Sequence, residues 1–187
     1  MGLAGRTGDP VEALKPVVPI ALRSGDCLLY RATGLFGWLI SIKTWSVVSH
    51  CEGYVGNGKA VASRDGVGVG LYDWRSADLL YVLRPNQPFD LKEALAQFNH
   101  KWRGQGYDWL GLLRFAWRAP VESLRFNNKQ FCSEFLTRWY RGGGMDPFNG
   151  ADADAIAPAS FLLSPVFDVY DVQLDGTLTR VHQRDVE

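Results

Sequence analysis

The sequence predicts one α+β domain in which helices pack against an antiparallel sheet. The expected order of elements is strand, helix, strands, helices and strand, and the strands of residues 46–85 are joined by turn signals. Of the 187 residues, 47% are hydrophobic, with seven Trp, seven Tyr and ten Phe, so the chain can bury a core. We expect the domain over residues 21–175, between an N-terminal arm over 1–20 and a C-terminal tail over 176–187.

The beginning of the domain predicts a strand followed by a helix. Gly25 and Asp26 form a turn signal before CLLYRA, residues 27–32, an apolar run of strand length. Thr33 can cap a helix over 35–44, whose apolar residues cover most of its circumference. Such a helix is expected to be buried.

An extended pattern begins at residue 46. Residues 46–74 contain β-branched side chains and two turn signals, Gly-Asn-Gly at 56–58 and Arg-Asp-Gly at 64–66. A further strand, LLYVLRP, is expected over 79–85. Together these segments predict two to four antiparallel strands.

The second half of the chain predicts helices and one final strand. Asp90 can cap the first of these helices, and Asn127 or Asn128 the third, which three glycines at 142–144 would end. The expected helices span 91–104, 109–119 and 129–141, and the strand spans 165–174.

The charge pattern excludes some function classes. Twenty basic and twenty acidic side chains give a formal net charge of zero, and neither sign forms a long block, so we expect neither nucleic acid nor an anionic membrane surface as a partner. GLFGWLISI is about half the roughly 20 residues of a membrane-spanning helix. The first residues lack the apolar run of a secretory signal, so we expect a protein that is cytoplasmic on synthesis.

Three cysteines, Cys27, Cys51 and Cys132, are too few and too odd in number for a disulfide framework. No Cys-x-x-Cys pair indicates a metal, and we expect no cofactor. If an asparagine caps the helix of Cys132, this cysteine lies in its first turn, where the helix dipole and free N–H groups stabilise a thiolate. Cys132 is therefore a candidate nucleophile, although a buried, inert thiol remains the alternative.

A nucleophilic cysteine needs a base, and the chain offers three histidines. His100 lies near the end of a solvent-facing helix and His182 lies in the polar tail. His50 lies in an extended segment, where it shares a strand face with Glu52, while Cys51 faces the core. A strand histidine bonded to a backbone carbonyl and a solvated glutamate are the structural alternatives.

Several motifs together resemble the permuted branch of the NlpC/P60 superfamily. They are GDCLLYR, TWSVVSHCE with its Gly-Asn-Gly hairpin, ASRDGVGV, YDW, FCSE and PASFLLSP, and they cover about residues 22–170. This papain-like group includes YiiX-type proteins and, more remotely, lecithin retinol acyltransferase. The resemblance implies a circularly permuted papain-like α+β fold in which the histidine strand precedes the cysteine helix.

The same resemblance implies the roles of individual residues. Cys132 would attack a carbonyl carbon to form an acyl-enzyme, and His50 would take the thiol proton and later activate water. Relatives often carry a Glu in the strand after the hairpin, where this chain has Ala62. The substitutes for the third, orienting residue are ranked Glu52, then Asp26 and Ser63. At strand spacing, Glu52 is expected to fold back or to act through a water.

The resemblance also implies a possible oxyanion role and a function. Tyr107 could help to hold the oxyanion, or could simply pack at a helix start. We expect a cysteine-dependent hydrolase that cleaves an amide bond in bacterial cell-wall peptide, as a peptidoglycan endopeptidase or amidase. Delivery by a secretion apparatus to the periplasm, with an immunity protein as partner, or by a phage particle would fit such an effector. The alternatives are a lipid acyl hydrolase or acyltransferase, with residues 34–45 facing lipid, and a non-catalytic module of a virion or secretion system.

Overall fold

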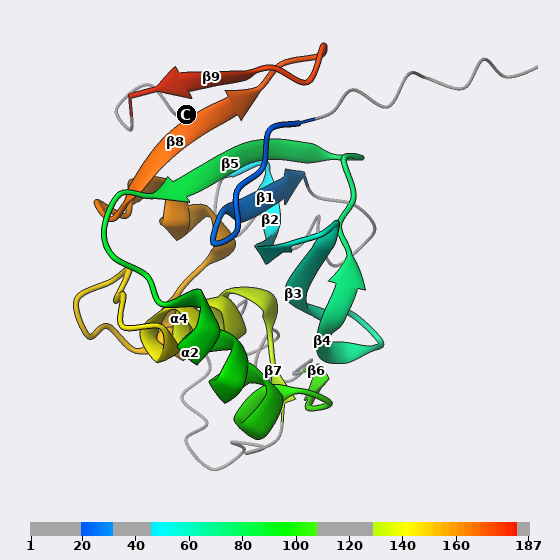
Figure 1. Cartoon of the computed structure of the whole chain (residues 1–187), viewed down its shortest axis with the longest axis vertical. Helices are drawn as coiled ribbons and strands as arrows, with labels where there is room; N and C mark the ends of the chain where they lie inside the picture. The colour runs from blue at the N-terminus through cyan, green and yellow to red at the C-terminus, as the bar shows by residue number, and fades with distance from the viewer. Residues whose placement is uncertain (1–19, 32–45, 108–128, 183–187) are drawn as a thin grey trace, which may run out of the picture.

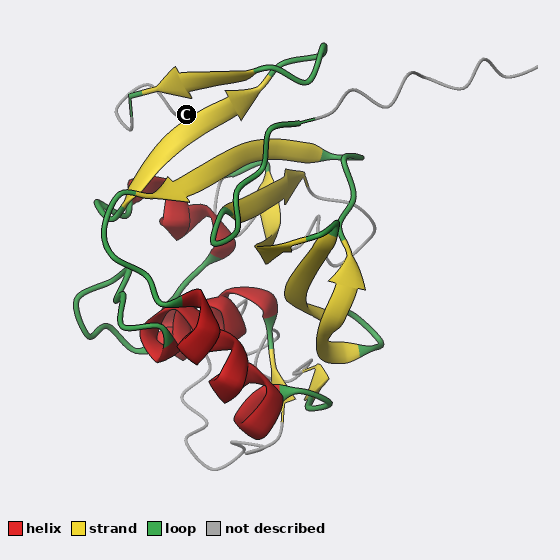
Figure 2. Cartoon of the chain, in the orientation of Figure 1, coloured by secondary structure: helices red, strands yellow, loops and turns green. Residues whose placement is uncertain are grey.

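The computed structural model describes residues 20–31, 46–107 and 129–182. The described chain forms a large antiparallel sheet with helices gathered on one side of it, as Figures 1 and 2 show. The predicted α+β class and its antiparallel sheet are thereby confirmed. The arm and the helices expected over 35–44 and 109–119 lie outside the described residues.

Seven strands form the main sheet, in the order β4-β3-β2-β1-β5-β8-β9, and every neighbouring pair is antiparallel. Their bounds are β1 Cys27–Arg31, β2 Val48–Gly56, β3 Lys59–Arg64, β4 Gly68–Asp73, β5 Leu79–Pro85, β8 Phe167–Val172 and β9 Leu178–Val181. A second, two-stranded sheet pairs β6 (Gly106–Tyr107) with β7 (Lys129–Gln130) in parallel.

Two tight turns set the register of β2, β3 and β4. Between β2 and β3, Asn57 and Gly58 have φ values of 51° and 71°, a left-handed conformation that Asn and Gly adopt at low cost. Between β3 and β4, Gly66 has a φ of 71°. Both turns were predicted from the sequence, and both are confirmed.

The first described helix, α2 (Leu91–Gln97), continues into a π-helical turn, η1 (Phe98–Trp102). Its predicted cap is confirmed, because the Asp90 side chain accepts a hydrogen bond from the backbone N–H of Glu93 at 3.0 Å.

The start of the second helix, α4 (Cys132–Gly142), corrects the sequence prediction. Lys129–Gln130 does not begin the helix but pairs as β7 with β6, and Phe131 in extended conformation is the N-cap, without a side-chain cap bond. Pairing with a strand distant in sequence therefore overrides the local asparagine signal. Cys132 becomes the first residue of the helix.

Close packing fixes α4 against the sheet. A Cβ at Gly53, in the middle of β2, would lie 2.6 Å from a ring carbon of Trp139, so only glycine lets the helix approach this closely. The Tyr140 hydroxyl, also buried, donates a hydrogen bond of 2.9 Å to the carbonyl oxygen of Gly25 before β1. The C-terminal half of α4 is thus held against β2 and the turn before β1.

The C-terminal part returns to the sheet. After the short 3₁₀ helices η2 (Ala153–Ala155) and η3 (Pro158–Leu163), β8 confirms the strand expected over 165–174. β9 then forms an edge strand within residues 176–187, where the sequence predicted only a tail. No helix among the described residues is long and apolar enough to span a membrane.

Candidate active site

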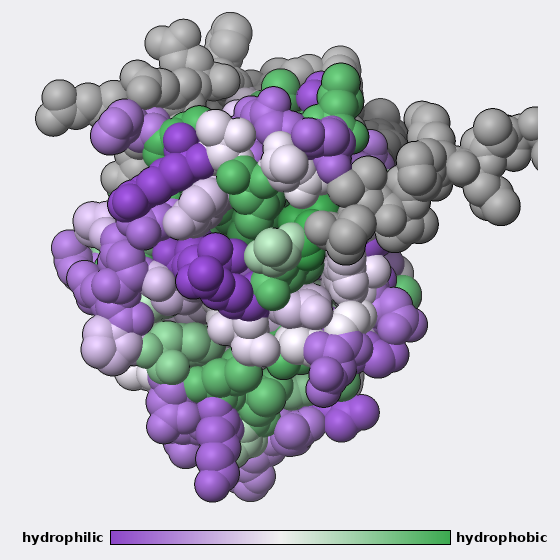
Figure 3. Space-filling model, turned by 45° about the horizontal axis from the view of Figure 1, so that its top comes forward, coloured by the Kyte–Doolittle hydropathy of each residue, from purple (hydrophilic) through white to green (hydrophobic). Residues whose placement is uncertain are grey.

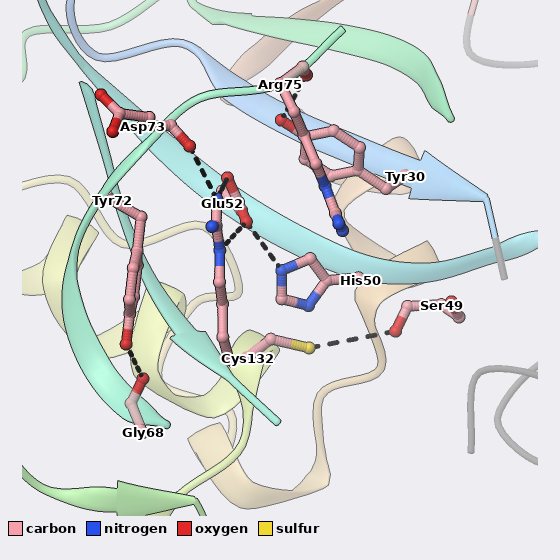
Figure 4. A network of polar contacts seen from close by, with 10 residues as sticks. Tyr30, Ser49, His50, Glu52, Gly68, Tyr72, Asp73, Arg75 and Cys132 are labelled. Atoms are coloured by element: carbon pink, nitrogen blue, oxygen red, sulfur yellow. Dashed lines mark hydrogen bonds and ion pairs between the residues drawn. The ribbon is translucent and has the colours of Figure 1, made fainter. Parts of the chain in front are cut away.

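The candidate site starts on β2, where His50 and Glu52 lie on the same face of the strand. Nε2 of His50 and Oε1 of Glu52 are 3.0 Å apart, so the two side chains bond directly (Figure 4). Of the two routes expected for Glu52, the direct contact fits the one in which its side chain reaches back to the ring, and no bridging water is needed. The imidazole also lies beside the ring of Tyr30 on β1, with ring centroids 5.9 Å apart.

Cys132 reaches the same place from the helix side. Its Sγ lies 4.0 Å from the carbonyl oxygen of Ser49, a residue 83 positions earlier in the chain. Figure 4 shows the sulfur beside the His50 ring, on the side of the nitrogen that does not bond Glu52. Cys132 is 2% exposed and the His50 side chain 18%, so solvent reaches the pair mainly at the imidazole.

The electrostatics favour a thiolate beside an imidazolium. A hydrogen bond from Cys51 lowers the pKa of Cys132 well below its usual value; burial opposes this, while the hydrogen bond and charge of His50 lower the pKa further. Burial by itself lowers the pKa of His50, but hydrogen bonds to Cys132 and Glu52, and their charges, raise it to about 9. The N-terminus of α4 adds a positive potential at the sulfur.

Glu52 is a completely buried carboxylate, which burial alone would keep protonated. The hydrogen bonds and charges of His50 and Arg64 nevertheless lower its pKa to about 2. Arg64 donates from Nε to Oε1 at 2.8 Å and from a terminal nitrogen to Oε2 at 3.1 Å. Glu52 is therefore ionised and held from two sides.

Sequence reasoning missed Arg64. A signal for it exists: Val61 pairs with Gly53 across β2 and β3, so alternation places Ala62 and Arg64 on the face of Glu52. An arginine two positions after Ala62 thus indicates a partner for a carboxylate on β2.

The other candidates for the third residue make different contacts. Asp26 accepts hydrogen bonds from Arg84 at 3.0 and 3.1 Å and from the backbone N–H of Arg23 at 2.7 Å. The Ser63 hydroxyl donates to the carbonyl oxygen of Gln130 at 2.6 Å and so ties β3 to β7. The structure thus brings Glu52 into contact with His50, whereas Asp26 and Ser63 bond to other groups.

Two further groups frame the site. Tyr107 on β6 pairs with Gln130, two residues before Cys132, so its strand lies beside the entry to α4. Cys51 is a buried free thiol. Its pKa is raised well above the usual value, chiefly by burial and then by its hydrogen bond to Cys132.

The remaining sequence candidates lie elsewhere. Cys27 is a buried free thiol whose pKa is raised, chiefly by burial. His100 and His182 are exposed and outside the site. In the described part of the chain, no group of three or more His, Cys, Asp or Glu residues could hold a metal ion.

Comparison with known proteins gives one relevant similarity. No family model matches the chain. A protein of Escherichia coli strain K12, named "Probable lipoprotein peptidase YaeF", is 25% identical over an alignment that covers 84% of this chain and 69% of the relative. The similarity supports a relationship to peptidases at low identity.

Proposed function

We propose that this protein is a cysteine hydrolase that cleaves an amide bond through an acyl-enzyme. Cys132 is the nucleophile, His50 the acid and base, and Glu52 the residue that orients His50. One observation supports this most directly: His50 bonds Glu52 through Nε2 while its other nitrogen is on the side of a thiol that begins a helix.

The reaction follows from this geometry. The Cys132 thiolate attacks the carbonyl carbon, and the oxyanion that forms is stabilised by the N-terminus of α4, beside the backbone N–H of Cys132. The His50 imidazolium then gives its proton to the leaving amine, which departs and leaves the acyl-enzyme. Neutral His50 next takes a proton from water and becomes the imidazolium again while the hydroxide attacks the acyl carbon. Breaking of the carbon–sulfur bond then releases the carboxylic acid product and the Cys132 thiolate.

The substrate class is cell-wall peptide, with the protein acting as a peptidoglycan endopeptidase or amidase. The similarity to a protein named as a peptidase supports peptide cleavage, and the motif resemblance to permuted NlpC/P60 proteins supports the cell wall. The same resemblance supports a papain-like permuted domain over residues 21–175. Residues 34–45, on which the lipid alternative depends, lie outside the described residues.

The test is to incubate the protein separately with purified cell wall and with phospholipid vesicles and to identify products by mass spectrometry. The wild type is expected to release peptide fragments with new amine termini, and Cys132→Ala none. Cys27→Ala is the matched control, because it removes a buried thiol that has no role in the proposed reaction. Fragment release by Cys132→Ala equal to that of the wild type would refute the proposal. Release of fatty acid alone would show that lipid, and not cell-wall peptide, is the substrate.

A further inference from the structure

Glu52 must remain a carboxylate while the charge of His50 changes during the proposed reaction, on which this inference rests. When His50 is an imidazolium, it compensates the buried Glu52 charge across the contact of 3.0 Å. When His50 has given its proton to the leaving group, that compensation is gone. A buried carboxylate without a cation is strongly disfavoured, so a second, permanent cation is needed.

Arg64 is the cation that meets this requirement. It supplies two of the three hydrogen bonds on the Glu52 carboxylate, and it shares Oε1 with the imidazole. A guanidinium, unlike an imidazole, keeps its charge throughout a reaction near neutral pH. Because both oxygens are held, the carboxylate cannot rotate away from Nε2 of His50.

Arg64 is itself held by the strand next to its own. One of its terminal nitrogens donates to the carbonyl oxygen of Asp73 at 3.0 Å, and its guanidinium lies 4.4 Å from the centre of the Tyr72 ring. The Tyr72 hydroxyl in turn donates to the carbonyl oxygen of Gly68 at 2.7 Å, as Figure 4 shows. The chain of contacts from β4 to His50 is therefore fixed at each step.

We propose that Arg64 is a positioning residue of the proposed hydrolase: it holds the Glu52 carboxylate ionised and directed at Nε2, so that His50 keeps one orientation toward Cys132 and releases its proton to the leaving group. Arg64 does not touch the reacting atoms. Its effect passes through Glu52.

Other titratable groups also surround His50. Cys132 approaches from α4, and Tyr30 contributes from β1, with the Arg75 guanidinium 5.2 Å from the centre of its ring. Burial first, and then the negative charge of Glu52, raise the pKa of Tyr30 well above its usual value, so it is a neutral neighbour. The variants below leave all of these groups in place.

A second buried arginine–carboxylate pair in the protein serves as a control for a purely structural ion pair. Arg84 binds Asp26, another completely buried carboxylate, with two hydrogen bonds of 3.0 and 3.1 Å. The other bond to Asp26 comes from a backbone N–H of Arg23, not from an ionisable ring. Arg84→Met therefore removes the same kind of contact without affecting His50.

The experiment compares Arg64→Met, Arg64→Lys, Arg84→Met and the wild type. The pKa of His50 is measured by NMR titration of its ring protons, and iodoacetamide alkylation of Cys132 is followed by mass spectrometry over the same pH range. Removal of a cation makes every nearby proton harder to lose, so Arg64→Met is expected to raise the pKa of His50 by about 1. The change in the alkylation rate of Cys132 that accompanies deprotonation of His50 at high pH should move upward by the same amount. Arg64→Lys should restore most of the wild-type value, and Arg84→Met should retain it.

The outcomes separate this inference from the function on which it rests. A reactive wild-type Cys132, with the pKa of His50 unchanged or lowered in Arg64→Met, would overturn the role of Arg64 alone. Equal changes in Arg64→Met and Arg84→Met would reduce Arg64 to a structural ion pair and also overturn it. A wild type whose Cys132 alkylates no faster than an ordinary thiol would overturn the proposed function, and the positioning role with it.

Discussion

Replacing Glu52 by glutamine tests how much the carboxylate contributes to stabilising a thiolate at Cys132. The pKa of His50 is about 9, against an ordinary value of 6.5, which corresponds to a preference for the imidazolium of about 3 kcal/mol at roughly 1.4 kcal/mol per pH unit. Cys132 and Glu52 together overcome the opposing effect of burial. Loss of one of these two anions is expected to lower the pKa of His50 by about 1 to 2.

The consequence for Cys132 is measurable. A less stable imidazolium supports the thiolate less, so the alkylation rate constant of Cys132, measured on the acidic limb of its own pH profile, should fall roughly 10- to 100-fold. The assay is iodoacetamide labelling read by peptide mass spectrometry. Asp26→Asn is the control, because it neutralises an equally buried carboxylate that contacts Arg84 and not His50. A Glu52→Gln rate within twofold of the wild type, or a loss seen only in Asp26→Asn, would refute the reasoning.

Three further predictions follow from burial and charge. Cys132 should be alkylated by iodoacetamide before the other two cysteines, whose pKa values are raised chiefly by burial; faster labelling of either would identify a different reactive thiol. Gly53→Ala should lower the free energy of unfolding by about 1 to 3 kcal/mol in urea denaturation, because its Cβ would meet the Trp139 ring; an unchanged midpoint would contradict this packing. The pKa of Glu52 is lowered from 4.5 to about 2, so the ionised carboxylate stabilises the fold fully above about pH 4.5, and this contribution is lost as the pH falls toward 2. The difference in unfolding free energy between the wild type and Glu52→Gln should therefore shrink by about 3 kcal/mol over that range. A difference that stays constant with pH would contradict this coupling between protonation and stability.

Local patterns in the sequence predicted much of the sheet and the shared strand face of His50 and Glu52. The turns at 56–58 and 64–66, the Asp90 cap and the strand over 165–174 depend on residues close in the chain, and the structure has all of them. His50 and Glu52 on one strand face follow from the period of two in a strand. The edge strand β9 was missed, because a short strand at the edge depends on its partner β8 more than on its own residues.

The sequence by itself identified the candidate site residues Cys132, His50 and Glu52 and the kind of element on which each lies. Only the tertiary structure decided how they meet: parallel pairing of β7 with β6 moved the start of the helix to Cys132, and close packing of Trp139 at Gly53 placed the body of that helix against β2. It also decided that Glu52, and not Asp26, meets His50, because each carboxylate is held by an arginine from another strand. The physical reason is range: turns and caps are set by residues a few positions apart, whereas ion pairs and strand partners depend on contacts between segments that are distant in the chain.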